Sequence, residues 1–214
     1  MFETSDLSAT LRMIGEENLD VRTVTIGVNL DACASEDPAR MCDAVRDRIR
    51  RAAGKLVPTA DAVAARYGVP IVNKRLAITP ASILLERHAG DRAAAVALAK
   101  ALDDAVQEVG IDLVGGYSAL VHKGMTPGER TLIDSIPEAL AATGHVCSSI
   151  NIGSTKAGIN VGAAALVAEK CSRSRRRRRT SAASAPRNWS SSRTSPRTTR
   201  SWRARSWAPA SRTS

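Results

Sequence analysis

The sequence predicts an α/β fold over residues 1–170, with parallel strands alternating with helices, followed by a disordered tail over residues 171–214. Two observations predict this organisation. Short apolar segments of strand length alternate with longer segments whose apolar residues recur at helical spacing. After about Lys170 the chain contains thirteen Arg and no Leu, Ile, Val, Met, Phe, Asp or Glu. Such a segment has no side chains with which to fill a core.

The first expected elements are a helix and a strand. Leu7, Leu11 and Ile14 lie at helical spacing and predict an amphipathic helix at the start of the chain. Residues 21–30 follow as a strand, because every second residue from Val24 to Leu30 is apolar while Thr, Gly or Asn stands between.

Residues 35–53 are predicted to be helical because their start carries two capping signals. Asp37 can accept hydrogen bonds from the free amides of the first turn. Pro38 stands in that turn, where its missing N–H has no consequence. A second helical segment over residues 61–68 is expected to end at Gly68.

The remaining segments up to residue 160 continue the alternation. In order, they are predicted as a strand over 69–80, an Ala-rich helix over 91–110, a strand region over 111–124, a helix over 129–144 bent near Pro137, and a strand within 145–160 that runs into a polar loop.

Charge and cysteine usage favour a soluble cytoplasmic protein. The formal net charge is +10, but taking the thirteen tail arginines from 31 Lys and Arg leaves 18 basic against 21 acidic residues, a net of −3 for residues 1–170. The four cysteines show no CxxC spacing and no neighbouring His pair, so neither a metal site nor a disulfide framework is predicted. No signal peptide or membrane-spanning run is recognisable in the sequence.

Four stretches together resemble one protein family. They are RTVTIGVNL, GVPIVNKRLAITP, DLVGGYSALVHKG and CSSINIGSTKAGIN, in this order along residues 1–170. They are similar to the domain of unknown function 711, also called uncharacterised protein family 0210. The resemblance implies a cytosolic protein of unassigned activity, with a fold like the α/β barrels of pyruvate formate-lyase-like glycyl-radical enzymes. Family members are much longer, so this chain would form a partial barrel.

The tail departs from the family pattern, which continues with LVVFAN, two variable residues and EDNPFMAG. Residues 188–204 can be back-translated with permitted codons and read again from the third base of the Asn188 codon. The result is LVVFANIPEDNPFMAG. The single codon of Trp189 and of Trp202 forces two of these residues. The tail is therefore predicted to be an out-of-frame translation that begins between about Lys170 and Ser181.

Cys147 is the candidate catalytic residue. It is expected at a strand end, where parallel α/β folds open their ligand crevice, and a lowered pKa would make it a nucleophile. His145 is two residues away and on the same strand face. The structural alternative is a small buried cysteine within a strand.

Asp31, Lys74, Ser154 and Lys156 are the candidate ligand-binding residues. Asp31 closes the first strand. Lys74 and Arg75 are adjacent strand residues, so at most one of them reaches an interior site. The loop GSTKAG, which contains Ser154 and Lys156, lacks Walker A spacing but could hold an anion; a plain turn is the alternative.

Three functions are consistent with these features. The first is an enzyme, or the remnant of one, that acts on a small anionic metabolite at the strand ends. The second is a non-catalytic ligand-binding or regulatory protein. The third is nucleic-acid binding through the arginine-rich tail, for which non-specific RNA contacts are expected rather than a specific partner. No radical glycine is recognisable in the chain, so no glycyl-radical mechanism and no cofactor is predicted. An incomplete barrel is expected to self-associate through its exposed edges.

The origin of the tail can be tested on the gene. Read in the third-base frame of codon 188, the nucleotide sequence is expected to encode LVVFAN followed two codons later by EDNPFMAG. Sequencing of the gene past codon 170 measures this directly. A gene that encodes no such string in any frame would contradict the out-of-frame origin.

Overall fold

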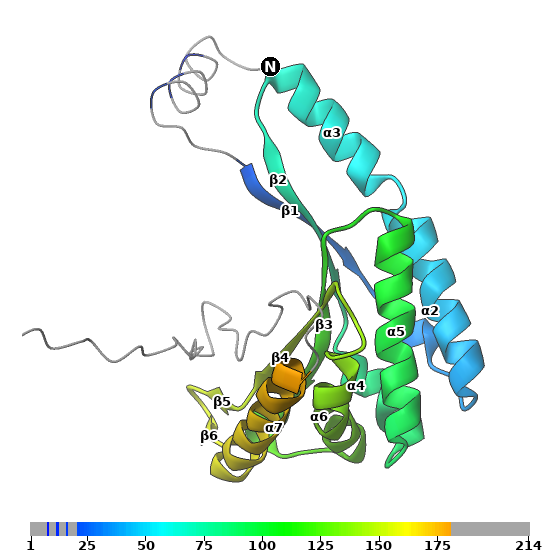
Figure 1. Cartoon of the computed structure of the whole chain (residues 1–214), viewed down its shortest axis with the longest axis vertical. Helices are drawn as coiled ribbons and strands as arrows, with labels where there is room; N and C mark the ends of the chain where they lie inside the picture. Colours follow the sequence, from blue (N-terminus) through cyan, green and yellow to red (C-terminus); the bar gives the residue numbers. More distant parts are fainter. Residues whose placement is uncertain (1–7, 9–11, 13–15, 17–20, 181–214) are drawn as a thin grey trace, which may run out of the picture.

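A four-stranded parallel sheet forms the centre of the structure, which is a computed structural model describing residues 21–180 and residues 8, 12 and 16, with side chains described up to Arg173. Its strands are β1 (Val21–Val28), β2 (Ile71–Ile78), β3 (Leu113–Leu120) and β4 (Val146–Asn151), and they are adjacent in that order (Figure 1). The α/β class with parallel strands is therefore confirmed. The helix expected at Leu7, Leu11 and Ile14 and the tail beyond residue 180 lie outside the described residues.

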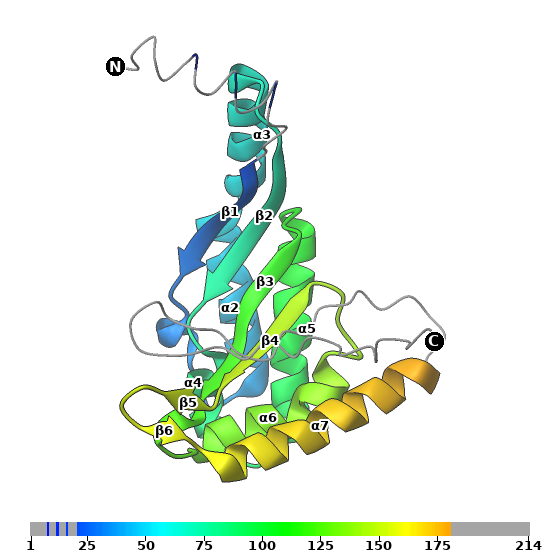
Figure 2. The ribbon, with the colours of Figure 1, turned by 90° about the vertical axis from the view of Figure 1, so that its left-hand side faces the viewer.

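The helices pack on one face of this sheet. Figure 2 looks onto the other face and shows the four strands in front of α2 and α5. The helical elements are α2 (Pro38–Ala53), α3 (Leu56–Tyr67), α4 (Ala81–Leu84), α5 (Arg92–Glu108), α6 (Pro127–Ala139) and α7 (Val161–Thr180), with short 3₁₀ turns η1 (Asp31–Cys33), η2 (Leu85–His88) and η3 (Val121–Lys123). Helices α2, α5, α6 and α7 each contact the next in that order.

The capping signals of the sequence act as expected. The Asp37 carboxylate accepts a hydrogen bond from the Ala39 amide at 2.9 Å, and Pro38 is the first residue of α2. Helix α3 ends at Gly68, whose φ of 69° is left-handed. Helix α6 begins with a reciprocal capping box between Thr126 and Glu129 and contains Pro137 in its last turn.

Two expectations for the C-terminal part are corrected. The polar loop after β4 contains a small antiparallel hairpin of β5 (Gly153–Ser154) and β6 (Gly158–Ile159). The chain is also helical beyond residue 170, because α7 continues without a break to Thr180. Arg is a good helix former and no Gly or Pro interrupts residues 171–180, so the helix extends into the segment that was expected to be disordered.

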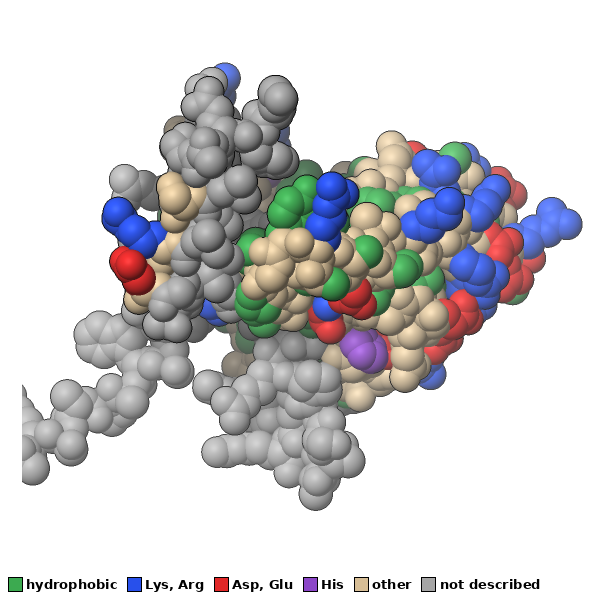
Figure 3. Space-filling model, turned by 90° about the horizontal axis from the view of Figure 1, so that it is seen from above, with side chains coloured by type: hydrophobic (Ala, Val, Ile, Leu, Met, Phe, Trp, Pro, Cys, Tyr) green, Lys and Arg blue, Asp and Glu red, His purple; other side chains and the backbone are tan. Residues whose placement is uncertain are grey.

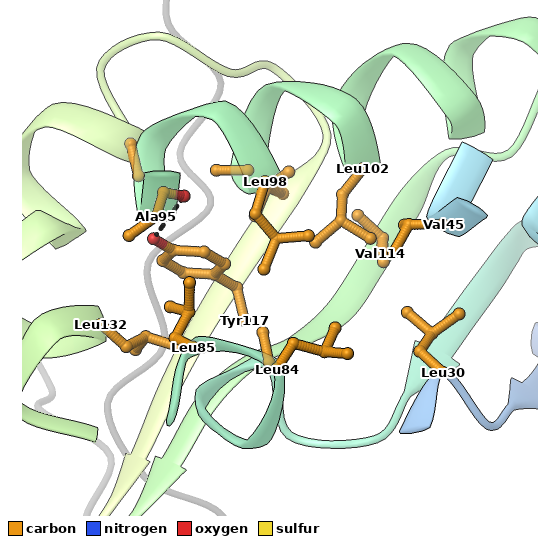
Figure 4. Packing of buried hydrophobic residues seen from close by; sticks show 14 of the residues in the cluster. Leu30, Val45, Leu84, Leu85, Ala95, Leu98, Leu102, Val114, Tyr117 and Leu132 are labelled. Carbon is orange, nitrogen blue, oxygen red and sulfur yellow. Dashed lines mark hydrogen bonds between the residues drawn. The ribbon is translucent and has the colours of Figure 1, made fainter. Parts of the chain in front are cut away.

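The hydrophobic core lies between the sheet and its helices (Figure 4). Tyr117 of β3 is fully buried there among Leu98, Leu102 and Leu132. Its hydroxyl donates to the Ala95 carbonyl at 3.1 Å and pairs with the Ser135 hydroxyl at 2.5 Å. Burial raises the pKa of Tyr117 well above its ordinary value, although the Ser135 bond opposes the shift, so the phenol stays neutral.

Acidic and basic side chains are interspersed over the helical layer, which lies on the right of Figure 3. Two ion pairs join α2 to α5: Arg46 lies 3.4 Å from Asp104, and Arg50 lies 2.7 Å from Glu108. Such exposed pairs add little stability singly.

A substitution at the bulge in β3 tests how β2 and β3 are paired. Gly116 has a φ of 125°, and a Cβ there would lie 2.6 Å from the Ile78 carbonyl oxygen of β2. Gly116→Ala is therefore expected to lower the free energy of unfolding by about 2–4 kcal/mol, from backbone strain and overpacking together. Gly27→Ala is the matched control in β1, because a Cβ there meets nothing within 4 Å. Denaturant unfolding of both variants measures the difference, and equal stabilities would contradict the register of β2 and β3.

Candidate functional site

One face of the sheet carries no helix of the described residues 21–180 and is here called the open face. Its middle row consists of very small residues. Paired residues of parallel strands point to the same face. The pairing places Gly27, Ala77, Gly115 and Cys147 side by side across all four strands. This row, here called the shelf, has no side chain larger than a cysteine.

The two faces of the sheet differ in chemistry. The neighbouring row on the helix-covered face consists of Ile26, Leu76, Val114 and Val146, all of which belong to or pack against the core. On the open face the shelf is bordered by Thr25, Arg75 and Leu113 on its amino side. On its carboxyl side it is bordered by Ser118 with Ser149. A surface of this kind is not built to pack against a second layer of helices, which parallel sheets normally carry.

The two adjacent cations of β2 lie on opposite faces. Lys74 lies on the helix side, where its Nζ is 2.9 Å from the Asp61 carboxylate of α3. Arg75 lies on the open face, and its Nε is buried with no hydrogen-bond partner among the described residues. The expectation that Lys74 contributes to the crevice is corrected: only one cation reaches the open face, as the alternation requires, and it is Arg75.

A signal for Arg75 was present in the sequence. Leu76 and Ile78, the bulky apolar residues at the end of β2, follow Lys74 by two and four residues and so lie on the same face of the strand. This alternation identifies the face that carries Lys74 as the core face and places Arg75 on the opposite face.

Cys147 lies on the open face, but at the amino end of its strand. It is the second residue of β4, so its expected position at the carboxyl end is corrected. His145 is not positioned to act as a general base for Cys147. The His145 imidazole lies 3.4 Å from the Asp103 carboxylate of α5, which also accepts the His145 amide at 2.6 Å. Asp103 thus fastens the start of β4 to α5.

Asp31, Ser154 and Lys156 lie at the carboxyl end of the sheet. Asp31 opens η1 directly after β1, while Ser154 and Lys156 belong to the hairpin after β4. These strands are the two edges of the sheet, about 14 Å apart at ~4.8 Å per strand. The Ser154 hydroxyl accepts the Ala157 amide at 3.0 Å, so it also closes the hairpin turn. The structure therefore does not bring the candidates together. Cys147 belongs to the shelf, Asp31 lies near one edge of the sheet, and Ser154 with Lys156 lies near the other.

The other described cysteines have raised pKa values. Burial raises the pKa of Cys33 and of Cys42, which both belong to the α2 region of the core side. Burial also raises the pKa of Cys171 to about 11. At neutral pH these three are protonated thiols and poor nucleophiles.

The described residues contain no group of three or more His, Cys, Asp or Glu side chains that could hold a metal ion. No helix in the described part of the chain has the length and apolar character needed to cross a membrane.

Comparison with known proteins gives a consistent result. The model of the family described as Uncharacterised ACR (DUF711) matches residues 12–188. A UPF0210 protein of Desulforudis audaxviator is 48% identical over 167 residues, which are 78% of this chain and 36% of that protein. One of Pelobacter propionicus is 50% identical over 162 residues, which are 76% of this chain and 35% of that protein. The chain thus spans about a third of the length of these curated relatives. It belongs to the uncharacterised family DUF711, whose curated members are named UPF0210 proteins.

Proposed function

We propose that the open face is a ligand-binding wall on which a small anionic metabolite lies, with Arg75 as its anion anchor. The observation that carries the proposal is the position of Arg75, whose buried Nε has no hydrogen-bond partner among the described residues and which lies beside a row of Gly and Ala. The proposal keeps the anionic class of ligand expected from the sequence and changes the cation that binds it.

The state of Arg75 favours an anionic ligand. A buried polar donor without a partner costs about 1–3 kcal/mol of stability. A carboxylate or phosphate would supply the acceptor, and arginine holds both groups with two parallel hydrogen bonds. Thr25, its register partner on β1, places a hydroxyl-bearing side chain on the same face of the neighbouring strand.

The shelf gives the ligand room. Gly27, Ala77 and Gly115 extend little or nothing above the sheet, so a molecule can approach the backbone closely there. Cys147 is two strands and two residues away from Arg75, about 12 Å between Cα atoms at standard sheet dimensions. One extended arginine side chain and a ligand of a few atoms can bridge that distance. Cys147 is the proposed catalytic group in the full-length relatives.

In those relatives we propose that the sheet closes into a barrel with the open face inside. The consecutive order of four parallel strands and their one-sided helices are features of α/β barrels, and support this. A likeness to pyruvate formate-lyase-like barrels is implied only by the resemblance of the sequence to the family.

The other binding residues and functions expected from the sequence stay predictions. Asp31, Ser154 and Lys156 at the strand ends could contact the same ligand from the rim, whereas Lys74 is held by Asp61 on the other face. Nucleic-acid binding and the out-of-frame origin concern the tail, most of which lies outside the described residues. Self-association through the β1 and β4 edges is likewise a proposal.

The adjacent cations provide a matched test. We expect Arg75→Gln to weaken binding of succinate at least tenfold, because the cation that β2 places on the open face is removed. Lys74→Gln removes the same charge from the opposite face and is expected to leave the affinity for succinate within about twofold. Isothermal titration calorimetry on the whole chain measures both. Equal binding by the native chain and Arg75→Gln would refute the proposal.

A further inference from the structure

A pocket of about 720 Å³ opens at the carboxyl end of β1, between η1 and α2. It is separate from the shelf, because α2 packs on the helix-covered side of the sheet. Its polar and reactive lining consists of Asn29, Asp31, Cys33, Asp47, Arg48 and Arg51. It is here called the β1-end pocket.

Helix α2 carries arginines in two different states. Arg46 and Arg50 face α5 and are paired with carboxylates. Arg48 and Arg51 face the pocket, and no carboxylate of the described residues forms an ion pair with either. Because they are three residues apart, their Cβ atoms are about 5–6 Å from each other. Two like charges thus lie side by side, and neither has an ion-pair partner among the described residues.

The two pocket arginines are oriented by backbone carbonyls. Arg48 Nε donates to the Asn29 carbonyl at 3.4 Å, and Arg51 Nε donates to the Asp47 carbonyl at 3.2 Å. These bonds use only the Nε of each guanidinium. Within the described part of the chain, no hydrogen bond or ion pair engages the terminal nitrogens of either arginine, and both residues line the pocket.

The carboxylates of the pocket cancel only part of this charge. Asp47 Oδ1 accepts from Arg50 at 3.1 Å, so its charge is shared with the α5 side. Among the described residues, Asp31 Oδ2 accepts the Asn29 amide at 3.2 Å and forms no ion pair. The pocket therefore has more cationic charge than anionic charge, and Asp31 can accept a further hydrogen bond.

The charges of the two arginines also influence the pKa of Cys33. Burial raises the pKa of Cys33, while the charges of Arg48 and Arg51 both oppose that increase. Both guanidinium charges therefore act on the floor of the pocket.

We infer that the β1-end pocket binds a hydroxylated phosphate monoester. Arg48 and Arg51 hold the phosphate, whose two negative charges match the two guanidiniums. Asp31 accepts a hydrogen bond from a hydroxyl group of the same ligand. Nothing in this assignment depends on Arg75 or on the open face.

Calorimetric titration of the whole chain with inorganic phosphate and with glycerol phosphate tests the inference. Glycerol phosphate is expected to bind more tightly than inorganic phosphate. Arg48→Gln with Arg51→Gln together is expected to weaken both at least tenfold, and Arg51→Gln alone by a smaller factor if the double variant unfolds. Asp31→Ala removes the acceptor for the ligand hydroxyl and is expected to abolish the preference for glycerol phosphate over inorganic phosphate.

The control is Arg40→Gln, an exposed arginine of α2 about 12 Å along the helix axis from Arg48. It should leave both affinities within twofold. Loss of binding in Arg40→Gln equal to that in the pocket variants would overturn the inference, as would unchanged binding in the double variant. Absence of binding by the native chain would also overturn it. Arg75→Gln separates the two sites: phosphate binding lost only in that variant supports the open face and contradicts the β1-end pocket.

Discussion

The register of the four parallel strands is the constraint on which the rest of the structure depends. Once β1 to β4 pair in this register, every strand residue is assigned to one of two faces. The row of Ile26, Leu76, Val114 and Val146 then lies under the helices and supplies the core, where each buried side chain contributes about 1.5–3 kcal/mol. The residues between them, which contribute little to that core, are left on the open face.

The side chains of the open face are therefore not constrained by packing against the core and can serve a chemical role. Gly116 illustrates the connection between the two faces: its backbone conformation makes the bulge, after which Tyr117 points into the core and Ser118 onto the open face. The buried Tyr117 hydroxyl is satisfied by Ala95 and Ser135, so this part of β3 is held firmly. A firmly held strand can present a small-residue floor in a constant position.

Local signals in the sequence were sufficient to predict the element types. Asp37 with Pro38 started α2, and Gly68 ended α3, because capping depends on a few neighbouring residues. The site could be predicted only in part. The choice between Lys74 and Arg75 depends on which face α3 covers, and Asp61 lies thirteen residues from Lys74 along the chain. Arg48 and Arg51 carried no signal at all, since exposed helical arginines are ordinary and only the tertiary pairing of Arg46 and Arg50 distinguishes them.

Reactivity of the native cysteines tests the central claim, that Cys147 lies on an approachable polar face while the other described thiols lie on the core side. The chain is treated with a small excess of iodoacetamide at pH 8, and the modified peptides are identified by mass spectrometry over time. Cys147 is expected to react first. Cys33 and Cys42 are 7% and 6% exposed with raised pKa values. Cys171, with a pKa of about 11, is thiolate in roughly one molecule in a thousand at that pH. Modification of Cys33 or Cys42 before Cys147 would contradict the assignment of the two faces.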